Sequence, residues 1–323
     1  MLKEYSGLAV KEMSETDSEF GCYPHERKID ECLDKGLVII DKPAGPTSHQ
    51  VAAWIREILG AKKVGHAGTL DPAVTGVLPS LVNTSTKITP ALLTEGKEYV
   101  FIMKLHKIVP EKKIRDAVND FVGTITQMPP VKSAVKRRLR QRNIYSLEIL
   151  EISGDYVLFR SDVQAGTYIR TLCVDLGKRL GVKAHMHALR RTRAGPFKEE
   201  QAFTLHDLKD AFETWKETGD ESKLREVLKP LEFGVKHMKK MLVKDSTVSA
   251  LCHGAPLHVG GISLYSSDVA ADDPVAVMTL KGELIGIGKA VIGFEDIKSK
   301  KKGVAATLSR IVMKEDLYPR MWK

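Results

Sequence analysis

The chain has 323 residues and a formal net charge of +9, with 43% hydrophobic and 28% charged residues. This composition is typical of a globular protein with one large core and a smaller domain. No apolar run approaches the roughly 20 residues that span a bilayer, and the N-terminus lacks the apolar core of a signal peptide. We therefore expect a cytoplasmic protein without a membrane segment. The cysteines are too few and too scattered for a disulfide framework or a zinc site: Cys22, Cys32, Cys173 and Cys252.

Charge is unevenly distributed along the chain. Residues 1–36 carry nine acidic and five basic side chains, a local charge of −4, so the remaining residues carry +13. A positive body favours a polyanionic partner, because long-range attraction to phosphate is the simplest use of such a charge. The acidic segment 1–36 has little apolar periodicity, and we expect it to be a loosely ordered N-terminal extension.

The chain after that extension predicts strands and helices in mixed order. An apolar run at 36–41 predicts a buried strand, and the segment 42–46, rich in Pro and Gly, predicts a stiff loop after it. Thr47 or Ser48 can cap the next helix, which Gly60 ends. Strands and helices without strict alternation indicate an α+β fold rather than a doubly wound sheet. The further predicted elements are a strand over 97–106, a helix over 110–122, a hairpin of 143–152 with 155–163, a helix from Thr167, and a helix from Thr204 to near Gly219.

From about residue 239 the chain changes to short segments rich in glycine and valine. These segments, with one brief helix over 246–253, predict a small β-rich module. We place the domain boundary near residue 237, which gives a first domain over 37–236 and a second over 237–323.

The most informative motif is a loop that holds one acidic residue, Asp71, in the string GHAGTLDP over 65–72. Gly65 and Gly68 permit backbone turns that a side chain disfavours, and Pro72 fixes φ directly after the acid. An Asp-Pro turn at the surface is the ordinary interpretation of this acid alone. A carboxylate on a stiff loop is also what nucleophilic or general-base catalysis needs, so Asp71 is a candidate catalytic residue.

No second chemical motif accompanies Asp71 in the sequence. We find no metal-ligand cluster, no glycine-rich phosphate loop and no Ser-His-Asp arrangement. His185 and His187 have a two-residue spacing without a third ligand, so we expect no metal and no cofactor. A single carboxylate suits cofactor-free chemistry at a glycosidic carbon, where an anion attacks C1′ or stabilises positive charge there.

These motifs resemble those of the TruB-like pseudouridine synthases. Asp71 falls on that family's catalytic aspartate, and the resemblance implies an enzyme that isomerises uridine in RNA. The segment 96–99 (GKEY) matches a motif whose tyrosine stacks on the target base and helps remove its C5 proton, which implies that role for Tyr99. The segment 166–172 (GTYIRTL) matches a motif whose arginine pairs with the catalytic aspartate, which implies that role for Arg170.

The same resemblance implies a pocket for a flipped-out base. Lys42 belongs to the family's Lys-Pro motif, which supports the active-site loop, and Leu189 helps to wall the uracil pocket. His66 and Tyr168 offer surfaces against the flipped base, since a base inside folded RNA has to leave its stack to react. Without the resemblance, these side chains and Tyr99 are ordinary strand, helix or core residues.

A basic run follows a Pro-Pro pair and contains six Lys or Arg among residues 132–142. Such a run is commonly a solvated surface. Its position on an expected loop beside the catalytic sheet favours instead a salt-sensitive grip on RNA phosphates. The candidate RNA-binding residues are Lys132, Lys136, Arg137, Arg138 and Arg140 of this run, together with Arg190 and Arg191.

Longer segments resemble the archaeal and eukaryotic H/ACA branch of the family: 133–140, 184–197 and 252–256. The resemblance implies a mixed-sheet pseudouridine synthase domain followed by a PUA domain, which binds the lower stem and ACA trinucleotide of a guide RNA. Base pairing by the guide then selects the uridine in rRNA or tRNA, and small H/ACA partner proteins support guided activity. The compact length without long lysine-rich tails favours the archaeal version.

Two other functions stay open on the sequence. A guide-independent synthase that modifies the T-loop of tRNA shares the catalytic motifs. A non-catalytic RNA-binding scaffold predicts the loss of Asp71, Tyr99 or Arg170, and all three are present. The first step is open as well, since attack of Asp71 at C1′ and proton abstraction use the same carboxylate.

Overall fold

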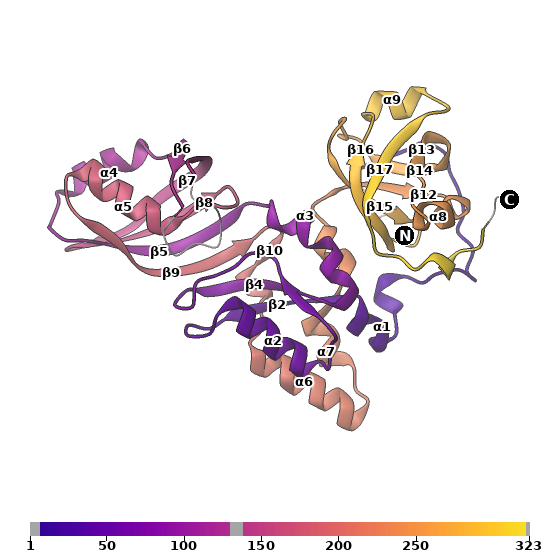
Figure 1. The fold of residues 1–323 in the computed structure, drawn as a ribbon, viewed down its shortest axis with the longest axis horizontal. Coiled ribbons are helices and arrows are strands. Elements are labelled where there is room, and N and C mark those ends of the chain that lie inside the picture. The colour runs from indigo at the N-terminus through magenta and orange to yellow at the C-terminus, as the bar shows by residue number, and fades with distance from the viewer. Residues whose placement is uncertain (1–6, 130–137, 321–323) are drawn as a thin grey trace.

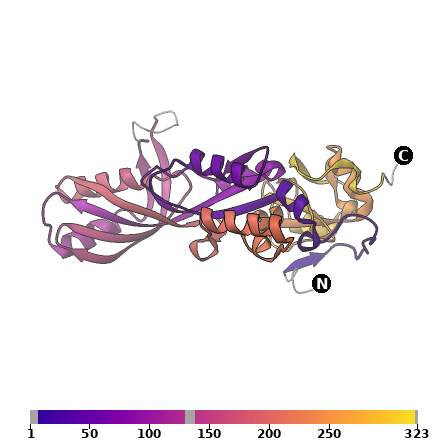
Figure 2. The same ribbon diagram turned by 90° about the horizontal axis from the view of Figure 1, so that it is seen from below.

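The computed structural model describes residues 7–129 and 138–320, which form two β-sheets with helices packed against them. The ten-stranded sheet extends through the left and central parts of Figure 1, and the seven-stranded sheet forms the part at upper right. Seen from below in Figure 2, the two sheets lie end to end in an elongated molecule. Strands and helices in mixed order confirm the α+β fold class expected from the sequence.

The ten-stranded sheet and its helices are built from residues 29–230. Its strands in chain order are β2 (Gly36–Lys42), β3 (Val64–His66), β4 (Thr75–Val82), β5 (Lys97–Leu105), β6 (Gly123–Gln127), β7 (Arg140–Ser153), β8 (Tyr156–Val163), β9 (Ala184–Ala194), β10 (Phe197–Lys198) and β11 (Leu228–Pro230). The helices are α1 (Ile29–Asp34), α2 (Ser48–Ile58), α3 (Thr89–Leu93), α4 (Glu111–Asn119), α5 (Ile169–Leu180), α6 (Leu205–Thr218) and α7 (Ser222–Val227).

The two halves of this sheet meet where β4 runs beside β9. The strand order is β11-β2-β4-β9-β5-β8-β7-β6, and among the described strands of this sheet only β4 and β9 pair in parallel. Gly76 of β4 has a φ of +105°, and a Cβ there would lie 2.1 Å from the carbonyl oxygen of Arg191 on β9. Glycine is therefore required at this crossing, because the two backbones approach too closely for any side chain.

Each half of the sheet has its own helical cover. The helices α2 and α6 pack on β2 and β4 through an apolar core that includes Val51, Ile55 and Leu208. The helices α4 and α5 pack on β5 and β8 around Phe101 and Phe159, whose rings stack with centroids 5.0 Å apart. The two halves thus bury separate cores and leave the loop of Asp71 between them.

The local signals at the helix ends were predicted correctly. Thr47 caps α2 in a reciprocal capping box, and Thr204 caps α6 in the same way. Gly219, with a φ of +77°, ends α6 as a left-handed residue. The helix predicted from Thr167 begins at Ile169, because the chain before it is held in extended conformation at Tyr168.

The C-terminal region supplies six strands of the seven-stranded sheet, which confirms the predicted β-rich module, and the N-terminal segment supplies the seventh. The strand order is β1-β14-β12-β15-β16-β17-β13. Its elements are β1 (Leu8–Val10), β12 (Lys239–Val243), α8 (Asp245–Cys252), β13 (Leu257–His258), β14 (Ile262–Ser266), β15 (Pro274–Thr279), β16 (Leu284–Ala290), α9 (Phe294–Ser299) and β17 (Val304–Ile311).

The N-terminal segment differs from the loosely ordered extension that was expected. β1 pairs antiparallel with β14, and the chain then runs along the C-terminal domain toward α1. The carboxylate of Asp245 accepts hydrogen bonds from the Thr16 hydroxyl and the Asp17 amide. The acidic composition was misleading, because strand pairing and polar contacts with a distant domain order a segment that has no core of its own.

The two domains share one apolar cluster across their boundary. Leu37, Val77 and Leu92 of the first domain pack in the same cluster as Leu242 and Met278 of the second. The backbone passes from one sheet to the other between a 3-10 helix at Leu231–Val235 and the start of β12 at Lys239. In the described ranges, no helix is long and apolar enough to cross a membrane.

Candidate active site

The loop that holds Asp71 is fixed by two side chains from the β2–α2 region. Lys42, which is completely buried, donates from Nζ to the carbonyls of Pro43, Pro72 and Val74 at 2.8, 3.0 and 2.8 Å. Burial lowers the pKa of Lys42, and the negative charge of Asp71 opposes this shift. Three carbonyl acceptors hold the ammonium group and make it an internal support of the loop, as the Lys-Pro motif implied.

Ser48, at the first turn of α2, holds the other side of the loop. Its hydroxyl accepts a hydrogen bond from the Leu70 amide at 2.8 Å and donates one to the Leu70 carbonyl at 3.0 Å. The expected stiffness of the loop therefore rests on Ser48 and Lys42 as well as on its glycine and proline residues. From the sequence, Ser48 was expected only as a possible helix cap.

Asp71 pairs with Arg170 in the first turn of α5. Arg170 Nη2 lies 3.1 Å from Asp71 Oδ2, and the two side chains are 37% and 44% exposed, respectively. The sequence predicted this pair, and the structure brings the two residues together from elements about 100 positions apart in the chain.

Gln127 of β6 positions the start of α5. Its side-chain oxygen accepts a hydrogen bond from the Tyr168 amide at 3.0 Å, and its side-chain nitrogen donates to the Tyr168 carbonyl at 3.2 Å. Gln127 is 2% exposed, so this two-way contact is buried and fixes the chain just before Arg170. Gln127 could not be predicted from the sequence, because no local pattern reveals a partner 41 residues away.

A cavity of about 540 Å³ opens beside Asp71. Six predicted site residues line it: Asp71, Tyr99, Tyr168, Arg170, Leu189 and Arg191. They come from the loop after β3, from β5, from the start of α5 and from β9, so four separate segments converge on one hollow. A cavity of this size, with a few convergent polar groups, is typical of a small-molecule or single-base site.

His66 lies beside this cavity and does not line it. Its ring meets that of His49 edge-on at 5.0 Å, and its Nδ1 atom is buried without a hydrogen-bond partner. Burial and the nearby positive charges of His49 and Arg191 lower the pKa of His66. His66 is therefore neutral near pH 7 and packs against the loop.

Arg190 and Arg191 differ from the phosphate-binding role expected for them. Arg191 is 1% exposed and donates to the carbonyls of Val77 and Gly68 at 2.8 and 3.0 Å. Arg190 points to the opposite face of β9. There its two terminal nitrogens donate hydrogen bonds to the Asp41 carboxylate, and its Nε donates one to Glu199. One arginine is buried and the other is neutralised by two carboxylates, so neither presents a free charge to a phosphate.

Lys97, which was expected only as part of the GKEY motif and without a role of its own, is a buried cation at the cavity wall. It is 5% exposed and donates to the carbonyls of Leu92, Leu93 and Glu95. Burial and the positive charge of Arg191 lower its pKa to about 8. Its position two residues before Tyr99 on the same face of β5 was the available signal, since strand residues alternate between faces.

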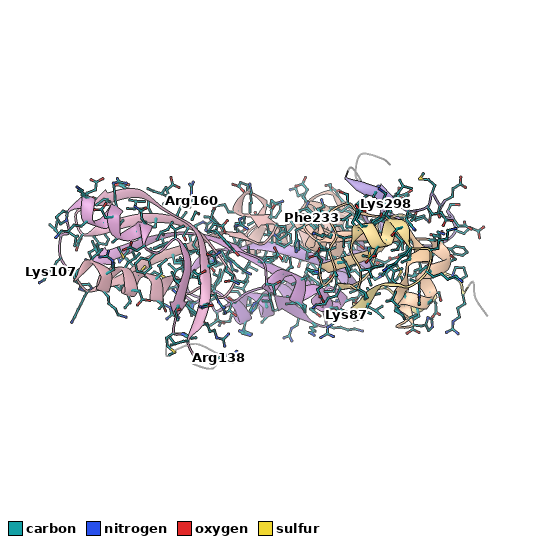
Figure 3. The ribbon with its side chains drawn as sticks, turned by 90° about the horizontal axis from the view of Figure 1, so that it is seen from above. Lys87, Lys107, Arg138, Arg160, Phe233 and Lys298 are labelled. Carbon is teal, nitrogen blue, oxygen red and sulfur yellow. The ribbon has the colours of Figure 1, made fainter. Side chains whose placement is uncertain are left out.

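The basic run is described only from residue 138 onward, so Lys132, Lys136 and Arg137 lie outside the described residues. Figure 3 shows Arg138 at the outer edge of the molecule, and Arg140 begins β7 as a half-exposed residue. Arg142, two residues further on, brings its guanidinium against Gly166 at the rim of the cavity. The C-terminal end of the run therefore lies beside the candidate site.

The histidines of the HMH string do not form a metal cluster with acidic or cysteine ligands. His185 contacts His106, with Nδ1 and Nε2 2.9 Å apart, while the ring of His187 packs edge-on against Tyr156. Within residues 7–129 and 138–320, no group of three or more His, Cys, Asp or Glu side chains is arranged to hold a metal ion.

Family models match nearly the whole chain. The model of the TruB family pseudouridylate synthase N-terminal domain matches residues 56–169, and that of the tRNA pseudouridylate synthase B C-terminal domain matches 170–236. The DKCLD domain model matches 1–52 and the PUA domain model matches 239–312. The chain is 51% identical to a probable tRNA pseudouridine synthase B of Methanosarcina barkeri over 98% of this chain and 93% of that protein.

The chain belongs to the TruB family of pseudouridylate synthases. A probable tRNA pseudouridine synthase B of Methanocaldococcus jannaschii is 50% identical over 98% of this chain and 94% of its own length. The chain is therefore a pseudouridine synthase, an isomerase of uridine in RNA, and its C-terminal sheet is a PUA domain.

Solved structures of similar proteins match the fold of nearly the whole chain. A chain of the crystal structure of a Cbf5-Nop10-Gar1 complex matches with a TM-score of 0.92 and 48% identity, covering 97% of this chain and 95% of that one. A chain of an H/ACA RNP bound to a substrate RNA containing 2′-deoxyuridine matches with a TM-score of 0.91 and 46% identity, covering 98% and 97%. The arrangement of catalytic and PUA domains is thus that of these proteins.

Proposed function

We propose that this synthase is the catalytic subunit of an H/ACA guide ribonucleoprotein, which isomerises guide-selected uridines in rRNA or tRNA and acts in the cytoplasm. The observation that supports this most is the match, over nearly the full length of both chains, to a subunit of an H/ACA RNP bound to a substrate RNA. By the same likeness, its partners are a guide RNA, the substrate RNA and small proteins such as the Nop10 and Gar1 of the matching complex.

In the proposed mechanism Asp71 acts on the sugar of the flipped-out uridine. The N1–C1′ bond breaks with its electron pair going to N1, either as Asp71 bonds to C1′ or as its carboxylate takes the C2′ proton. The base then turns and C5 bonds to C1′, while the Asp71–C1′ bond breaks or the C2′ proton is returned. The C5 proton is lost and N1 gains one, so the product is an isomer. Arg170, 3.1 Å away, aims the carboxylate through a charge-assisted contact.

Tyr99 and the cavity walls orient the base. Tyr99, directly opposite Arg191 across the β5–β9 pair, stacks on the base and assists removal of the C5 proton. Tyr168 and Leu189 enclose the uracil from two other sides, and His66 packs behind the loop. The base is extruded from its stack and held between apolar and aromatic surfaces.

Two buried cations support the charge that develops on the base. Arg191 and Lys97 both lie against Gly68, where a Cβ would meet Arg191 Nη1 at 3.3 Å and the Lys97 side chain at 3.9 Å. With a pKa of about 8, Lys97 is mostly protonated at neutral pH. The carbonyl groups that accept hydrogen bonds from Arg191 and Lys97 carry no net charge, so they do not neutralise these cations. Both cations therefore stabilise the electron-rich uracil that forms when the glycosidic bond breaks.

RNA outside the pocket is held by charge and by the PUA domain. Arg138 and Arg140, with Lys132, Lys136 and Arg137 of the same run, contact phosphates in a salt-dependent way. The helix α8 and the turn after it at 254–256 face the ACA trinucleotide of the guide. Arg190 and Arg191 are left out of this surface because their charges are already engaged.

A guide-independent activity on tRNA is the second candidate function. It is favoured by the relatives, which are named probable tRNA pseudouridine synthase B at 50–51% identity. Both activities use the same pocket, so one protein can have both.

Release of tritium from RNA labelled at uridine C5 tests these proposals. Wild type should release tritium from a guide-matched RNA only with guide and partner proteins, and Asp71→Asn should lower the rate by about 10³-fold or more, since it loses the nucleophile or base. Asp120→Asn, which alters an exposed pair with Arg179, is the matched control and should retain activity.

Release without a guide from tRNA alone would favour the second candidate. Tight guide binding without any release from either RNA would indicate a non-catalytic scaffold and reject both activities. Wild-type activity retained by Asp71→Asn would exclude Asp71 as the reacting group.

A further inference from the structure

The N-terminal segment is bound to the PUA domain by strand pairing and hydrogen bonds along its described length. β1 adds a strand to the edge of the PUA sheet, and Lys11 donates to the carbonyls of Lys298 and Lys300 at the end of α9. Lys281 in turn donates to the carbonyls of Asp17 and Phe20. The segment is therefore anchored to the PUA domain up to about residue 22.

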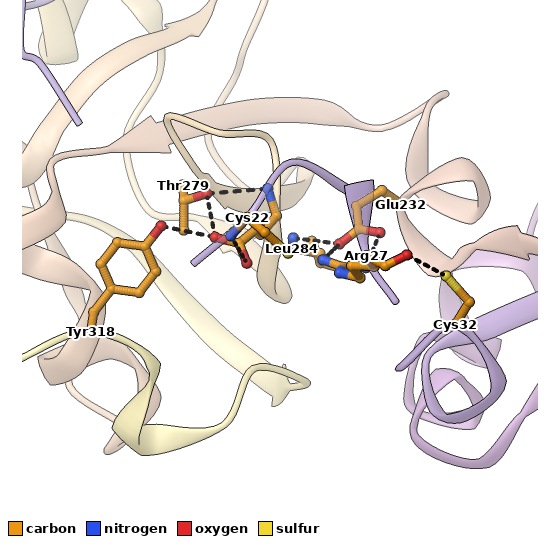
Figure 4. A network of polar contacts seen from close by, with 8 residues as sticks. Cys22, Arg27, Cys32, Glu232, Thr279, Leu284 and Tyr318 are labelled. Atoms are coloured by element: carbon orange, nitrogen blue, oxygen red, sulfur yellow. Dashed lines mark hydrogen bonds and ion pairs between the residues drawn. The ribbon is translucent and has the colours of Figure 1, made fainter. Parts of the chain in front are cut away.

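The segment then reaches the domain junction at Arg27, as Figure 4 shows. The Arg27 guanidinium donates to both carboxylate oxygens of Glu232 at 2.7 and 2.8 Å, and the two side chains are 3% and 9% exposed. One of those oxygens also accepts the Leu284 amide of the PUA strand β16 at 3.0 Å. The Arg27 carbonyl accepts a hydrogen bond from Arg225 of α7 at 2.8 Å.

A second buried carboxylate continues the network into the PUA domain. Glu283, 2% exposed, accepts hydrogen bonds from the Cys22 amide and from the Tyr318 hydroxyl at 2.8 Å. Thr279 contacts the same carboxylate and completes the network drawn in Figure 4. The N-terminal segment, the catalytic domain, the PUA sheet and the chain near the C-terminus thus meet at Glu232 and Glu283.

These polar contacts differ in kind from the apolar cluster that the two domains share. Apolar burial holds surfaces together, but it is non-directional and tolerates sliding and rotation. A bidentate arginine–carboxylate pair has fixed geometry, because two parallel N–H···O bonds set both distance and angle. Burial of the pair is costly in desolvation, and one use of such a pair is to select a single arrangement.

We propose that the Arg27–Glu232 pair is a positioning device that fixes the PUA domain relative to the catalytic pocket. This inference rests on the proposed guide-dependent function. A guide whose ACA end is held by the PUA domain presents its target uridine at a set distance, so the pair defines which guide stem length brings a uridine to Asp71. Arg27 touches no reacting atom and acts only through domain placement.

The expected consequence is a strict dependence on guide length. Adding or removing one base pair in the stem between the ACA end and the target moves the uridine by several ångströms, and a misplacement of about 1 Å can cost about 10²-fold in rate. Wild type should therefore prefer the matched guide by about 10²-fold. A protein with a loosened junction should lose most of that preference while retaining turnover.

Guided pseudouridylation with matched, lengthened and shortened guides tests this in the complete complex. Arg27→Lys keeps the charge but replaces the two-point contact by a single one, and we expect its preference to fall to about tenfold. The double variant Arg27→Met with Glu232→Gln leaves no unpaired charge and should behave similarly. Arg179→Lys changes an arginine–carboxylate pair on the surface and should keep the wild-type preference. Thermal unfolding checks that each variant is folded.

The distance between the domains is measured in parallel. Spin labels on noncanonical residues at the exposed positions Lys209 of α6 and Lys289 of β16 should give one narrow distance distribution in wild type and a broader one in Arg27→Lys. A folded Arg27→Lys with wild-type length preference and an unchanged distribution would overturn the proposal. If wild type itself shows no guide dependence, the proposed function fails, and the width of the distribution alone decides on the positioning role.

Discussion

Two arginine–carboxylate pairs of this synthase have opposite surroundings. Asp71 and Arg170 meet through one contact of 3.1 Å beside an open cavity, with both side chains more than a third exposed. Arg27 and Glu232 meet through two contacts of 2.7 and 2.8 Å, with both side chains less than a tenth exposed. The first pair is accessible to a substrate and the second is sealed between two domains.

The difference separates a carboxylate that a substrate can reach from one that is enclosed by protein. An exposed pair contributes little to stability, because water screens it, and its carboxylate remains free to act on a bound nucleotide. A buried pair contributes through geometry, and removal of one partner leaves a charge without solvent or counterion. Exposure, rather than the residue types, therefore indicates which pair a substrate can reach.

The largest expected effect is on stability, and it concerns the buried pair of Arg27 and Glu232. Arg27→Met should lower the free energy of unfolding by about 3–5 kcal/mol, because the Glu232 carboxylate is left buried and unpaired. Asp71→Asn should change it by less than about 1 kcal/mol, since that pair is solvated. Urea denaturation followed by circular dichroism measures both. Equal losses for the two variants would contradict the distinction drawn from exposure.

A second test concerns activity at the exposed pair. Arg170→Met should reduce kcat by about 10²-fold, because the carboxylate loses the charge that aims it, with little change in the free energy of unfolding. Arg170→Lys should recover part of the rate, since it restores the charge without the planar guanidinium. Single-turnover rates on saturating RNA check this, with Arg179→Met as the surface control. A change in RNA affinity alone, at wild-type kcat, would assign Arg170 to binding.

The smallest expected effect is on the pH dependence of stability, and it arises from the buried charge of Lys97 at the cavity wall. Folding lowers the pKa of Lys97 from 10.5 to about 8 through burial and the charge of Arg191, with Arg193 adding to the shift and Glu95 opposing it. Between these two pH values the unfolded chain binds more protons than the folded one, so the free energy of unfolding rises with pH.

The wild type should therefore gain stability relative to Lys97→Met as the pH increases from about 8 to 10. Denaturant titrations of both proteins across this pH range measure the difference in their free energies of unfolding. The contributions of the other lysines cancel in this difference, because both proteins contain them. A difference that stays flat or falls would show that Lys97 keeps an ordinary pKa in the folded protein.

Several details of the site were predictable from short stretches of sequence and others were not. The Asp71 loop, the Thr47 and Thr204 caps and the strand of Tyr99 each follow from neighbouring residues. The role expected for Arg191 failed because the strand β9 was not predicted. On a strand, consecutive side chains point to opposite faces, so Arg190 and Arg191 cannot both face the RNA.

By itself the sequence determined the family, the α+β class, the catalytic-loop motif and the pairing of Asp71 with Arg170, because local patterns and motif identity are contained in the residues themselves. Tertiary structure alone decided that Arg27 meets Glu232 across 205 positions, that Arg191 supports Gly68 across 123, and that the acidic N-terminal segment is ordered on the PUA domain. The physical reason is that burial and hydrogen-bond partners between distant segments exist only after the chain has folded, so no local signal records them.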